Sequence, residues 1–253
     1  IDYIFIGEGE ITFVEFVQAL EGEVIFENVA GIAYRKNKHI HKNVARLPIR
    51  NLDELPFPDY SDFNLYKYEI LFPYFERKPI LFVVSSRGCV NRCVFCSTSA
   101  FWEEWRKRSP ENIICEINHL VDKYNVKTIK FADDIFTVDK KRTIEICDRM
   151  IEEKYDIYWS ALTRVDYFDE EIAMKMRDAG CRFLSFGTES ASDEILKKIN
   201  KRQTSEDIYR AFDICRNIKL TTELALIVGN PGENDQSIED NIKLIRYVKP
   251  EIF

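Results

Sequence analysis

Three cysteines lie close together in the first half of the chain. Cys89, Cys93 and Cys96 follow the spacing C-x3-C-x2-C. Thiolates this close together on a loop favour soft metals and iron–sulfur clusters. A cubane [4Fe–4S] cluster has four irons, so three cysteines leave one iron without a protein thiolate. By analogy with catalytic zinc, an unfilled coordination position is where a small molecule binds and reacts.

Two simpler interpretations of the triad stay open. The cysteines could form a zinc knuckle that takes a fourth ligand, or they could be three free thiols in a core. His39, His41 and His119 are remote from the triad in sequence, which weakens the zinc interpretation. The segment 85–88, Ser-Ser-Arg-Gly, is polar and carries a glycine, which is not typical of a core. The sequence therefore favours the cluster.

From about residue 80 onward, strand-like runs alternate with amphipathic helical runs. We expect strands at 80–84, 126–131, 157–162, 181–186 and 224–228, and the start of a sixth near 251. Helices are expected between them, and Ser109 and Asp139 are expected to be N-caps. This alternation predicts right-handed βαβ units and a parallel sheet. The fold class is therefore α/β, a partial (β/α)6 barrel related to the TIM architecture.

Polar and charged residues follow the strands at their carboxyl ends, where chemistry takes place in such barrels. The cysteine loop follows the first strand, Asp133 and Asp134 the second, Arg164 the third, Glu189 the fourth, and a glycine-containing turn at 229–232 the fifth. Each also has a structural interpretation. The aspartates could form a turn or helix cap, the arginine a salt bridge, the glutamate a surface carboxylate and the glycines a plain turn. Their shared position at one end of the sheet favours a site.

Composition limits the class of protein. Hydrophobic residues make up 45% of the 253 residues and charged residues 31%, as in an average globular protein. No apolar run approaches the ~20 residues that span a bilayer, and the N-terminus lacks the basic start of a signal peptide. The net charge of −7 argues against broad nucleic-acid binding. Seven cysteines, an odd number, do not resemble a secreted disulfide framework, so we expect a reducing cytoplasm.

The cysteines outside the triad have a structural explanation. Cys115, Cys147 and Cys215 fall on apolar helix faces, and Cys181 opens a strand. We expect all four to be buried and to behave as small hydrophobic residues.

The first 78 residues follow a different pattern. We expect a strand at 1–6, a turn at 7–10, a helix at 12–20, a hairpin over 31–42 and then a proline-containing linker. The chain starts without Met in what looks like the middle of a strand, and it ends where another strand begins. We therefore expect it to be a piece of a longer protein.

The triad resembles that of the radical S-adenosylmethionine (SAM) superfamily. The resemblance rests on the spacing, on the aromatic residue Phe95 before the last cysteine, and on the loop's place after the first strand of a partial barrel, and it covers about residues 79–253. It implies that the open iron of a [4Fe–4S] cluster chelates the amino and carboxylate groups of SAM. Electron transfer from a reductant such as flavodoxin or ferredoxin then cleaves the sulfonium. The products are methionine and a 5′-deoxyadenosyl radical, which takes a hydrogen atom from the substrate.

The same resemblance implies contacts between particular residues and SAM. Phe95 would lie against the adenine. Ala132-Asp133-Asp134 takes the place of the family's Gly-Gly-Glu motif, so one of the two aspartates would meet the methionyl amino group. Glu189 matches the ribose-binding position.

Two further contacts with SAM are implied. The backbone of Ile227 and Val228, on the fifth strand, would meet the adenine. Arg164 is a candidate partner for the SAM carboxylate, and its simpler role as a structural salt bridge stays open.

The N-terminal part resembles one branch of this superfamily, in which a cobalamin-binding-type Rossmann domain precedes the radical SAM core. The resemblance rests on the segments 3–10, 52–60, 106–111 and 131–137. It implies the C-terminal end of the cobalamin-binding-type domain at 1–27, a hairpin and linker at 28–78, and the radical SAM core at 79–253.

Two glycines carry the cobalamin expectation. Gly7 and Gly9 would lie where this branch accommodates the nucleotide tail of the corrinoid, because glycine permits close approach of the backbone. The alternative is a turn followed by a capped helix. The branch's cobalt-binding motif, Asp-x-His-x-x-Gly, would lie upstream of Ile1. Whether cobalamin is a third cofactor, and whether the reaction is methyl transfer or another radical reaction, therefore depends on residues before Ile1.

Two competing assignments are less well supported by the sequence. The tRNA-modifying methylthiotransferase branch places three cluster cysteines in an upstream domain, and no cysteine precedes Cys89. Together with the acidic charge, this makes nucleic acid an unexpected partner. A non-catalytic iron–sulfur or zinc module would not require carboxylates at the strand ends. The sequence therefore predicts a radical SAM enzyme with a small-molecule or peptide substrate that the sequence does not identify.

Overall fold

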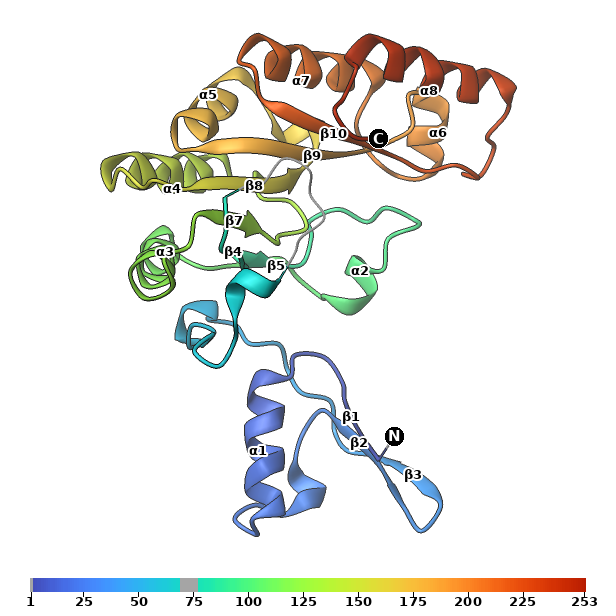
Figure 1. Cartoon of the computed structure of the whole chain (residues 1–253). Coiled ribbons are helices and arrows are strands. Elements are labelled where there is room, and N and C mark those ends of the chain that lie inside the picture. Colours follow the sequence, from blue (N-terminus) through green and yellow to red (C-terminus); the bar gives the residue numbers. More distant parts are fainter. Residues whose placement is uncertain (1, 69–76) are drawn as a thin grey trace. The chain divides into compact units, whose positions relative to one another are not determined.

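The computed structural model describes residues 2–68 and 77–253, and the chain divides into two compact units, Ile1–Leu52 and Asp53–Phe253. Each unit has its own sheet and its own hydrophobic core. Figure 1 shows the elements of both units.

The first unit is a three-stranded antiparallel sheet packed against one helix. The strands are β1 (Tyr3–Phe5), β2 (Ile32–Lys36) and β3 (His39–Lys42), in that order, and the helices are α1 (Glu10–Leu20) and the 3-10 turn η1 (Phe26–Asn28). Val29, Ile32 and Tyr34 form its buried core, around which aromatic rings from the strand, helix and turn pack. The expected strand, helix and hairpin are all present, and β1 pairs with the hairpin strand β2.

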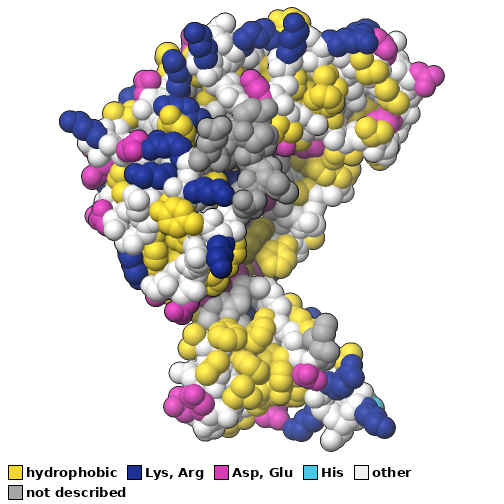
Figure 2. Space-filling view, viewed as in Figure 1, with side chains coloured by type: hydrophobic (Ala, Val, Ile, Leu, Met, Phe, Trp, Pro, Cys, Tyr) yellow, Lys and Arg dark blue, Asp and Glu magenta, His cyan; other side chains and the backbone are white. Residues whose placement is uncertain are grey.

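Helix α1 leaves several large apolar side chains outside this core. Phe13, Val14 and Leu20 are 56%, 56% and 61% exposed. Figure 2 shows apolar side chains gathered on one face of the unit. Contiguous apolar surfaces of this kind are typical of interaction surfaces.

The second unit contains a five-stranded parallel sheet with the strand order β10-β9-β8-β7-β4. The strands are β4 (Ile80–Val83), β7 (Thr128–Phe131), β8 (Tyr158–Thr163), β9 (Cys181–Glu189) and β10 (Thr221–Leu226). Each strand after β4 pairs in parallel with the strand of this sheet that comes before it along the chain, as consecutive βαβ units require. The α/β fold with a parallel sheet, expected from the alternation, is confirmed.

Helices connect the strands and cover one face of the sheet (Figure 1). They are α3 (Pro110–Tyr124), α4 (Lys140–Glu152), α5 (Glu170–Asp178), α6 (Asp193–Lys198), α7 (Ser205–Asn217) and α8 (Asp235–Val248). The short helices are η4 (Val165–Tyr167) after β8, α2 (Thr98–Phe101) in the cysteine loop, and η2 (Leu52–Glu54) and η3 (Leu65–Lys67), which precede β4. Ser109 and Asp139 cap α3 and α4 as expected. Among the described residues, no helix combines the length and the apolar character needed to cross a bilayer.

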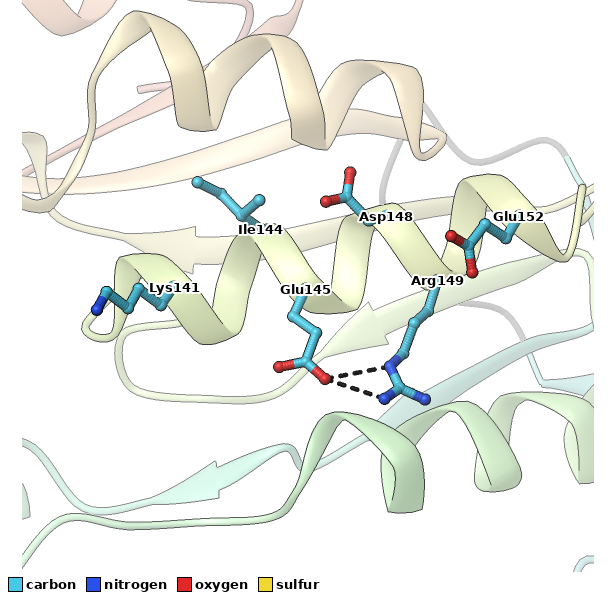
Figure 3. A pocket seen from close by; sticks show the side chains of 6 residues that line it. All are labelled: Lys141, Ile144, Glu145, Asp148, Arg149 and Glu152. Carbon is cyan, nitrogen blue, oxygen red and sulfur yellow. Dashed lines mark hydrogen bonds and ion pairs between the residues drawn. The ribbon is translucent and has the colours of Figure 1, made fainter.

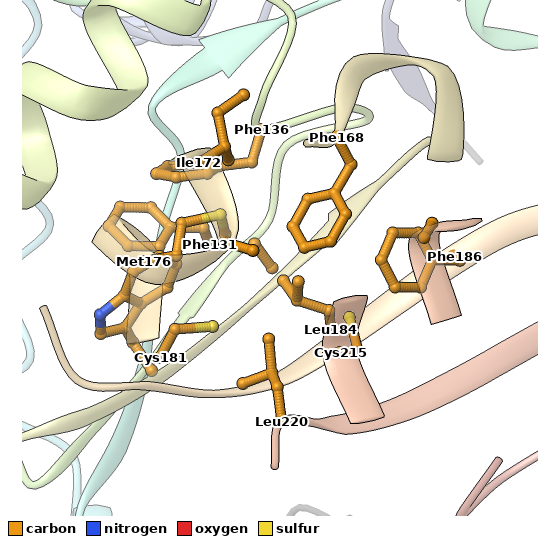
Figure 4. Packing of buried hydrophobic residues seen from close by; sticks show 14 of the residues in the cluster. Phe131, Phe136, Phe168, Ile172, Met176, Cys181, Leu184, Phe186, Cys215 and Leu220 are labelled. Carbon is orange, nitrogen blue, oxygen red and sulfur yellow. The ribbon is translucent and has the colours of Figure 1, made fainter. Parts of the chain in front are cut away.

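The core lies between the sheet and its helices. Ile129, Phe131 and Trp159 are fully buried, whereas Phe82 and Leu162, which point to the other face, are 44% and 38% exposed. Figure 4 shows part of this cluster, in which aromatic rings from β7, from β9 and from the segments that follow β7 and β8 pack against aliphatic side chains. Because side chains alternate between the faces of a strand, one face is packed and the other is open, as in a half-closed barrel.

The fifth strand begins and ends earlier than expected. β10 spans Thr221–Leu226, so Ile227 and Val228 follow the strand and are not part of it. The Ile227 N–H still donates to the Glu189 carbonyl (3.0 Å), but Val228 is 80% exposed. Pairing stops here because the neighbouring strand β9 ends at Glu189, whose φ of +66° departs from extended backbone.

Of the expected sixth strand, the described residues contain one parallel bridge, between Glu223 and Ile252. Ile252 packs against Ile80 and Phe183 on the open face of the sheet. The position of the sixth strand beside β10 is therefore consistent with a partial barrel.

One expectation about the cysteines is wrong. Cys115 is exposed, because it points away from the side of α3 on which Ile113 is buried. Cys147, Cys181 and Cys215 are buried as expected. Burial raises the pKa of each of these three thiols, so they remain protonated.

The packing of α3 on the sheet gives a test of this core. Replacing the fully buried Ile117 with alanine is expected to lower the free energy of unfolding by about 2–5 kcal/mol, because a cavity is left. The urea midpoint of unfolding measures the change. Ile151→Ala on α4, where the side chain is 37% exposed, is the matched control and should have a much smaller effect. Equal shifts would contradict the assignment of the buried face.

Candidate functional site

A short two-stranded antiparallel ribbon forms the base of the cysteine loop. β5 (Ser86–Arg87) pairs in antiparallel orientation with β6 (Arg106–Lys107), so residues 88–105 form a closed loop. The ribbon follows β4, the first strand of the parallel sheet. The three cysteines therefore lie at the carboxyl end of that strand, as the sequence predicts.

Asp133 joins this ribbon to the end of β7. Its carboxylate accepts hydrogen bonds from the Ser85 hydroxyl (2.8 Å), the Ser85 backbone N–H (3.2 Å) and the Ser86 hydroxyl. The residue is only 3% exposed, and burial raises the pKa of Asp133, while these hydrogen bonds act in the opposite direction. Asp133 is thus a clamp that holds the base of the cysteine loop.

A buried arginine supports the ribbon from a neighbouring helix. Arg142 donates from Nη2 to the Ser85 carbonyl (2.6 Å) and from Nε to the Arg108 carbonyl (2.9 Å). Arg108 in turn pairs with Glu116 on α3. The sequence analysis missed Arg142, because a charged residue near the start of an amphipathic helix is usually on its solvent side.

The strand ends enclose a hollow of about 450 Å³. This volume falls within the range of small-molecule sites, about 300–1,000 Å³. Eight residues predicted from the sequence line it: Cys89, Cys93, Phe95, Cys96, Asp133, Asp134, Arg164 and Glu189. The fold therefore brings the cysteine loop together with the carboxyl ends of β7, β8 and β9.

Four predicted residues do not line this hollow. Ile227 and Val228 are absent from its lining, although Ala225 of β10 contributes to it. Gly7 and Gly9 belong to the first unit, and a Cβ added at either would meet no atom within 4 Å. Their expected contacts with adenine and with the corrinoid remain predictions.

The three thiols differ in burial and in their N–H donors. Cys93 is buried, whereas Cys89 and Cys96 are partly exposed. The Cys89 sulfur accepts from the backbone N–H (3.4 Å) and Nδ2 (3.8 Å) of Asn91, and the Cys93 sulfur accepts from Arg164 Nη1 (3.7 Å). Burial raises the pKa of Cys93, and nearby cations oppose this effect. Hydrogen bonds to the sulfurs are among the features that tune iron–sulfur clusters.

This donor set fits a cluster better than a single metal ion. Within residues 2–68 and 77–253, no group of three or more His, Cys, Asp and Glu side chains could hold one metal ion. In a cubane cluster each thiolate binds a different iron, so the sulfurs surround a space and need not converge on a point. Three cysteines around a hollow meet this requirement, which weighs against a zinc knuckle. The partly exposed Cys89 and Cys96 are also unlike free thiols of a core.

A buried ion pair also lines the hollow. Glu189 Oε1 lies 2.8 Å from Lys201 Nζ, and the two residues are 9% and 5% exposed, so Glu189 is not a surface carboxylate. Gly187 leaves room for the pair, because a Cβ there would lie 2.9 Å from Glu189 Oε1. The Lys201 ammonium is also 5.9 Å from the centre of the Phe95 ring, within the range of cation–π attraction.

Lys201 is a site residue that the sequence analysis missed. It lies in the basic run 197–202 at the end of α6, and such a run is typical of a solvated surface. Lys197 and Lys198 of the same run are exposed. No sequence pattern separates these three lysines, and only the tertiary fold turns one of them inward.

Arg164 is held in one orientation. Its Nε and Nη2 donate to the two carboxylate oxygens of Asp166, at 2.8 Å each, and Nη2 also donates to the Lys201 carbonyl. The salt bridge considered from the sequence is therefore present, and Nη1 of the same guanidinium meets the Cys93 sulfur. The expected contact between Arg164 and the SAM carboxylate remains a prediction.

Asp134 differs from its neighbour Asp133. It is partly buried, lines the hollow and accepts a hydrogen bond from Thr98 Oγ1 (3.2 Å). Burial raises the pKa of Asp134, and the Thr98 hydrogen bond opposes this effect. Of the two aspartates, Asp134 is the one whose carboxylate is not committed to the base of the loop.

A second hollow, of about 600 Å³, lies along α4. Figure 3 shows that its lining comes from this one helix and that Arg149 donates two hydrogen bonds to Glu145 Oε1, at 3.2 and 3.0 Å. An exposed pair of this spacing stabilises a helix surface. The six lining residues include no cysteine or histidine, so this hollow offers no soft-metal ligand.

Comparison with known proteins gives a family and close relatives. Residues 83–245 match the Radical SAM superfamily. An uncharacterized methyltransferase of Pyrococcus horikoshii is 37% identical over 97% of this chain and 53% of its own length. The anaerobic magnesium-protoporphyrin IX monomethyl ester cyclase of Rubrivivax gelatinosus is 32% identical over 100% of this chain and 46% of its own length. The chain thus spans about half the length of these curated relatives.

Solved structures of low sequence identity share the fold. The radical S-adenosylmethionine methyltransferase TsrM from Kitasatospora setae, solved with cobalamin and a [4Fe–4S] cluster bound, has a TM-score of 0.77 at 18% identity and covers 98% of this chain and 50% of its own. OxsB, a cobalamin-dependent S-adenosylmethionine radical enzyme, has a TM-score of 0.74 at 22% identity and covers 96% of this chain and 36% of its own. Since the family match includes the cysteine loop and the strand ends that enclose the hollow, this chain belongs to the radical SAM superfamily.

Proposed function

We propose that this chain is the core of an enzyme that holds a [4Fe–4S] cluster on Cys89, Cys93 and Cys96 and cleaves SAM reductively. The observation that carries the proposal is one hollow at the strand ends, lined by the three thiols and by carboxylates from two strands. When bound, the cluster supplies the electron that cleaves the sulfonium of SAM to methionine and a 5′-deoxyadenosyl radical. A non-catalytic module would have no need of the carboxylates around the same space.

The side chains around the hollow offer partners for the polar groups of SAM. We assign the methionyl amino group to Asp134, because Asp133 is occupied by Ser85 and Ser86. A carboxylate beside an ammonium group is a favourable charge-assisted pair. The methionyl carboxylate would meet a cation of the same hollow.

Two cations are available for that carboxylate, Arg164 and Lys201, each already paired with an acidic residue. The Phe95 ring, which is 44% exposed, is available to stack on adenine. Glu189 would accept hydrogen bonds from the ribose hydroxyls. The adenine contact of the backbone at 227–228 is retained as part of the proposal, from the loop after β10.

For the full protein we propose cobalamin-dependent methyl transfer, with ring closure as the second outcome. Methyltransferases of Pyrococcus horikoshii and Streptomyces wedmorensis match 97% and 95% of this chain, and the Rubrivivax gelatinosus cyclase matches 100%. In this proposal residues 1–27 are the end of a cobalamin-binding-type domain, 28–78 a hairpin and linker, and 79–253 the radical SAM core. Gly7 and Gly9 would leave space for the corrinoid tail.

The proposed reaction needs a one-electron donor of low potential. A flavodoxin or a ferredoxin is the proposed partner. The seven cysteines are all free, which supports a reducing compartment such as the cytoplasm.

Anaerobic reconstitution of the full-length protein tests the proposal. With dithionite and SAM, 5′-deoxyadenosine should accumulate, measured by liquid chromatography. Cys93→Ala should abolish both the cluster absorbance and the product, because it removes one of three ligands. Cys147→Ala, in a buried cysteine outside the site, is the matched control and should retain both. Wild-type protein with a full cluster but no product would refute the proposed cleavage.

The two aspartates should separate SAM binding from cluster assembly. Asp134→Asn is expected to weaken SAM binding by at least about tenfold, since a charge-assisted hydrogen bond contributes about 1.5–3 kcal/mol, and to leave the iron content unchanged. Asp133→Asn should instead lower the iron content, because it disturbs the clamp on the cysteine loop. Calorimetric titration with SAM and an iron assay measure the two effects. If Asp133→Asn lost SAM affinity and kept its iron content, the methionyl amino group would have to be assigned to Asp133 instead of Asp134.

Cluster assembly should also depend on the glycine before Cys89. Gly88 has a φ of +87°, and a Cβ there would lie 2.5 Å from the Glu104 carbonyl on the other limb of the loop. Gly88→Ala is therefore expected to lower the iron bound per chain. Gly229→Ala is the matched control, since its φ is +93° but no atom lies within 4 Å of the added Cβ, so it has backbone strain without a collision. Equal iron content in the two variants would argue against a steric role for Gly88.

A further inference from the structure

Arg164 touches one of the three cysteines proposed to hold the cluster. Its Nη1 lies 3.7 Å from the Cys93 sulfur, where the thiol acts as a weak acceptor. Arg164 is 3% exposed and Cys93 is 8% exposed. An ionised donor therefore meets the sulfur where screening by water and salt is weak.

The orientation of this guanidinium is set by groups other than the sulfur. Asp166 accepts from Nε and from Nη2, at 2.8 Å each, and the Lys201 carbonyl accepts from Nη2. Two-point pairing with a carboxylate fixes the plane of an arginine side chain. The direction of Nη1 is thus determined by Asp166, which lies two residues further along the chain in η4.

The donors to the triad differ in charge. Cys89 accepts from two neutral N–H groups of Asn91, whereas Cys93 accepts from a cation. Lys201, a second buried cation, lies in the same hollow, and like Arg164 it is paired with an acidic residue. Arg164 is thus a cation that acts on the triad by direct contact with a sulfur.

A positive charge beside a cluster ligand stabilises the reduced cluster, because reduction adds one negative charge to a site of low dielectric. Net charge and hydrogen bonds to the sulfurs are known determinants of iron–sulfur potentials. We propose that Arg164 is a positioning residue that raises the reduction potential of the cluster through the Cys93 sulfur, and that Asp166 limits this effect. The inference rests on the cluster in the proposed function, and the electron comes from a low-potential donor.

A purely structural salt bridge leads to a different expectation. If the pair only holds η4 in place, loss of either partner disturbs the fold in the same way. If the charge acts on the cluster, the two losses have opposite effects on the potential. Removing the guanidinium lowers the potential, whereas removing the Asp166 charge leaves the guanidinium uncompensated and raises it.

The test is a potentiometric titration of the full-length, anaerobically reconstituted protein without SAM. Dithionite and redox mediators set the potential, and electron paramagnetic resonance measures the reduced cluster. At a fixed potential, Arg164→Met should lower the ratio of reduced to oxidised cluster about tenfold, which corresponds to about 59 mV for one electron. Asp166→Asn should raise this ratio.

An exposed arginine–aspartate pair on α7 provides matched controls. Arg216 Nη1 lies 2.8 Å from Asp213 Oδ1, and neither residue lines the hollow. Arg216→Met and Asp213→Asn should therefore leave the potential unchanged. These two variants carry the same amino-acid changes as the two site variants, but in an ion pair that does not contact the three cysteines.

Opposite shifts in the two site variants, with no shift in the two control variants, support the proposal. Absence of a shift in both site variants, or shifts in the same direction, overturns it. If Arg164→Met binds too little iron for a titration, the Asp166→Asn variant alone tests the proposal. A higher reduction potential in that variant supports the proposal, and an unchanged or lower one overturns it. Wild-type protein that assembles no cluster overturns the proposed function as well, and its iron and sulfide content reveals this before any titration.

Discussion

The structure depends on the hydrogen bonds that the Asp133 carboxylate accepts from Ser85 and Ser86. A carboxyl group withdrawn from water costs free energy unless it is well hydrogen-bonded, so the Asp133 side chain and the ribbon hold each other in place. This bond network joins two strands of the sheet to the loop that carries the thiols. The loop at 88–105, which carries the three thiols, is thereby anchored to the parallel sheet.

Two ion pairs lie at this end of the sheet. Glu189 with Lys201 and Arg164 with Asp166 are buried beside the hollow. Buried ion pairs contribute little net stability, since desolvation offsets their attraction. Their value here is geometric, because each pair fixes a charge at a defined place around a small space. The protein thus places two buried ion pairs beside the hollow.

Much of this arrangement follows from the sequence. Strand and helix periods predict the parallel sheet, and the rule that strand ends meet at one edge brings Asp134 and Glu189 to the cysteines. Other features depend on tertiary structure alone. Lys201 and Arg142 belong to runs typical of solvent-exposed helices, and their inward direction is decided by the elements around them. The expectation for Cys115 was wrong because the helical period places it on the side of α3 opposite Ile113 and Ile117, so its apolar character did not decide its burial.

The order of strands in the sheet has a consequence for biosynthesis. β4, β7, β8, β9 and β10 lie in the sheet in the order in which the ribosome makes them, each beside its predecessor. Asp133 emerges directly after β7, so the base of the cysteine loop is complete while three strands are still to be made. The walls that later enclose the thiols come from those strands. A chain that stopped before β8 would therefore keep the residues at the base of the loop but lack the walls of the hollow.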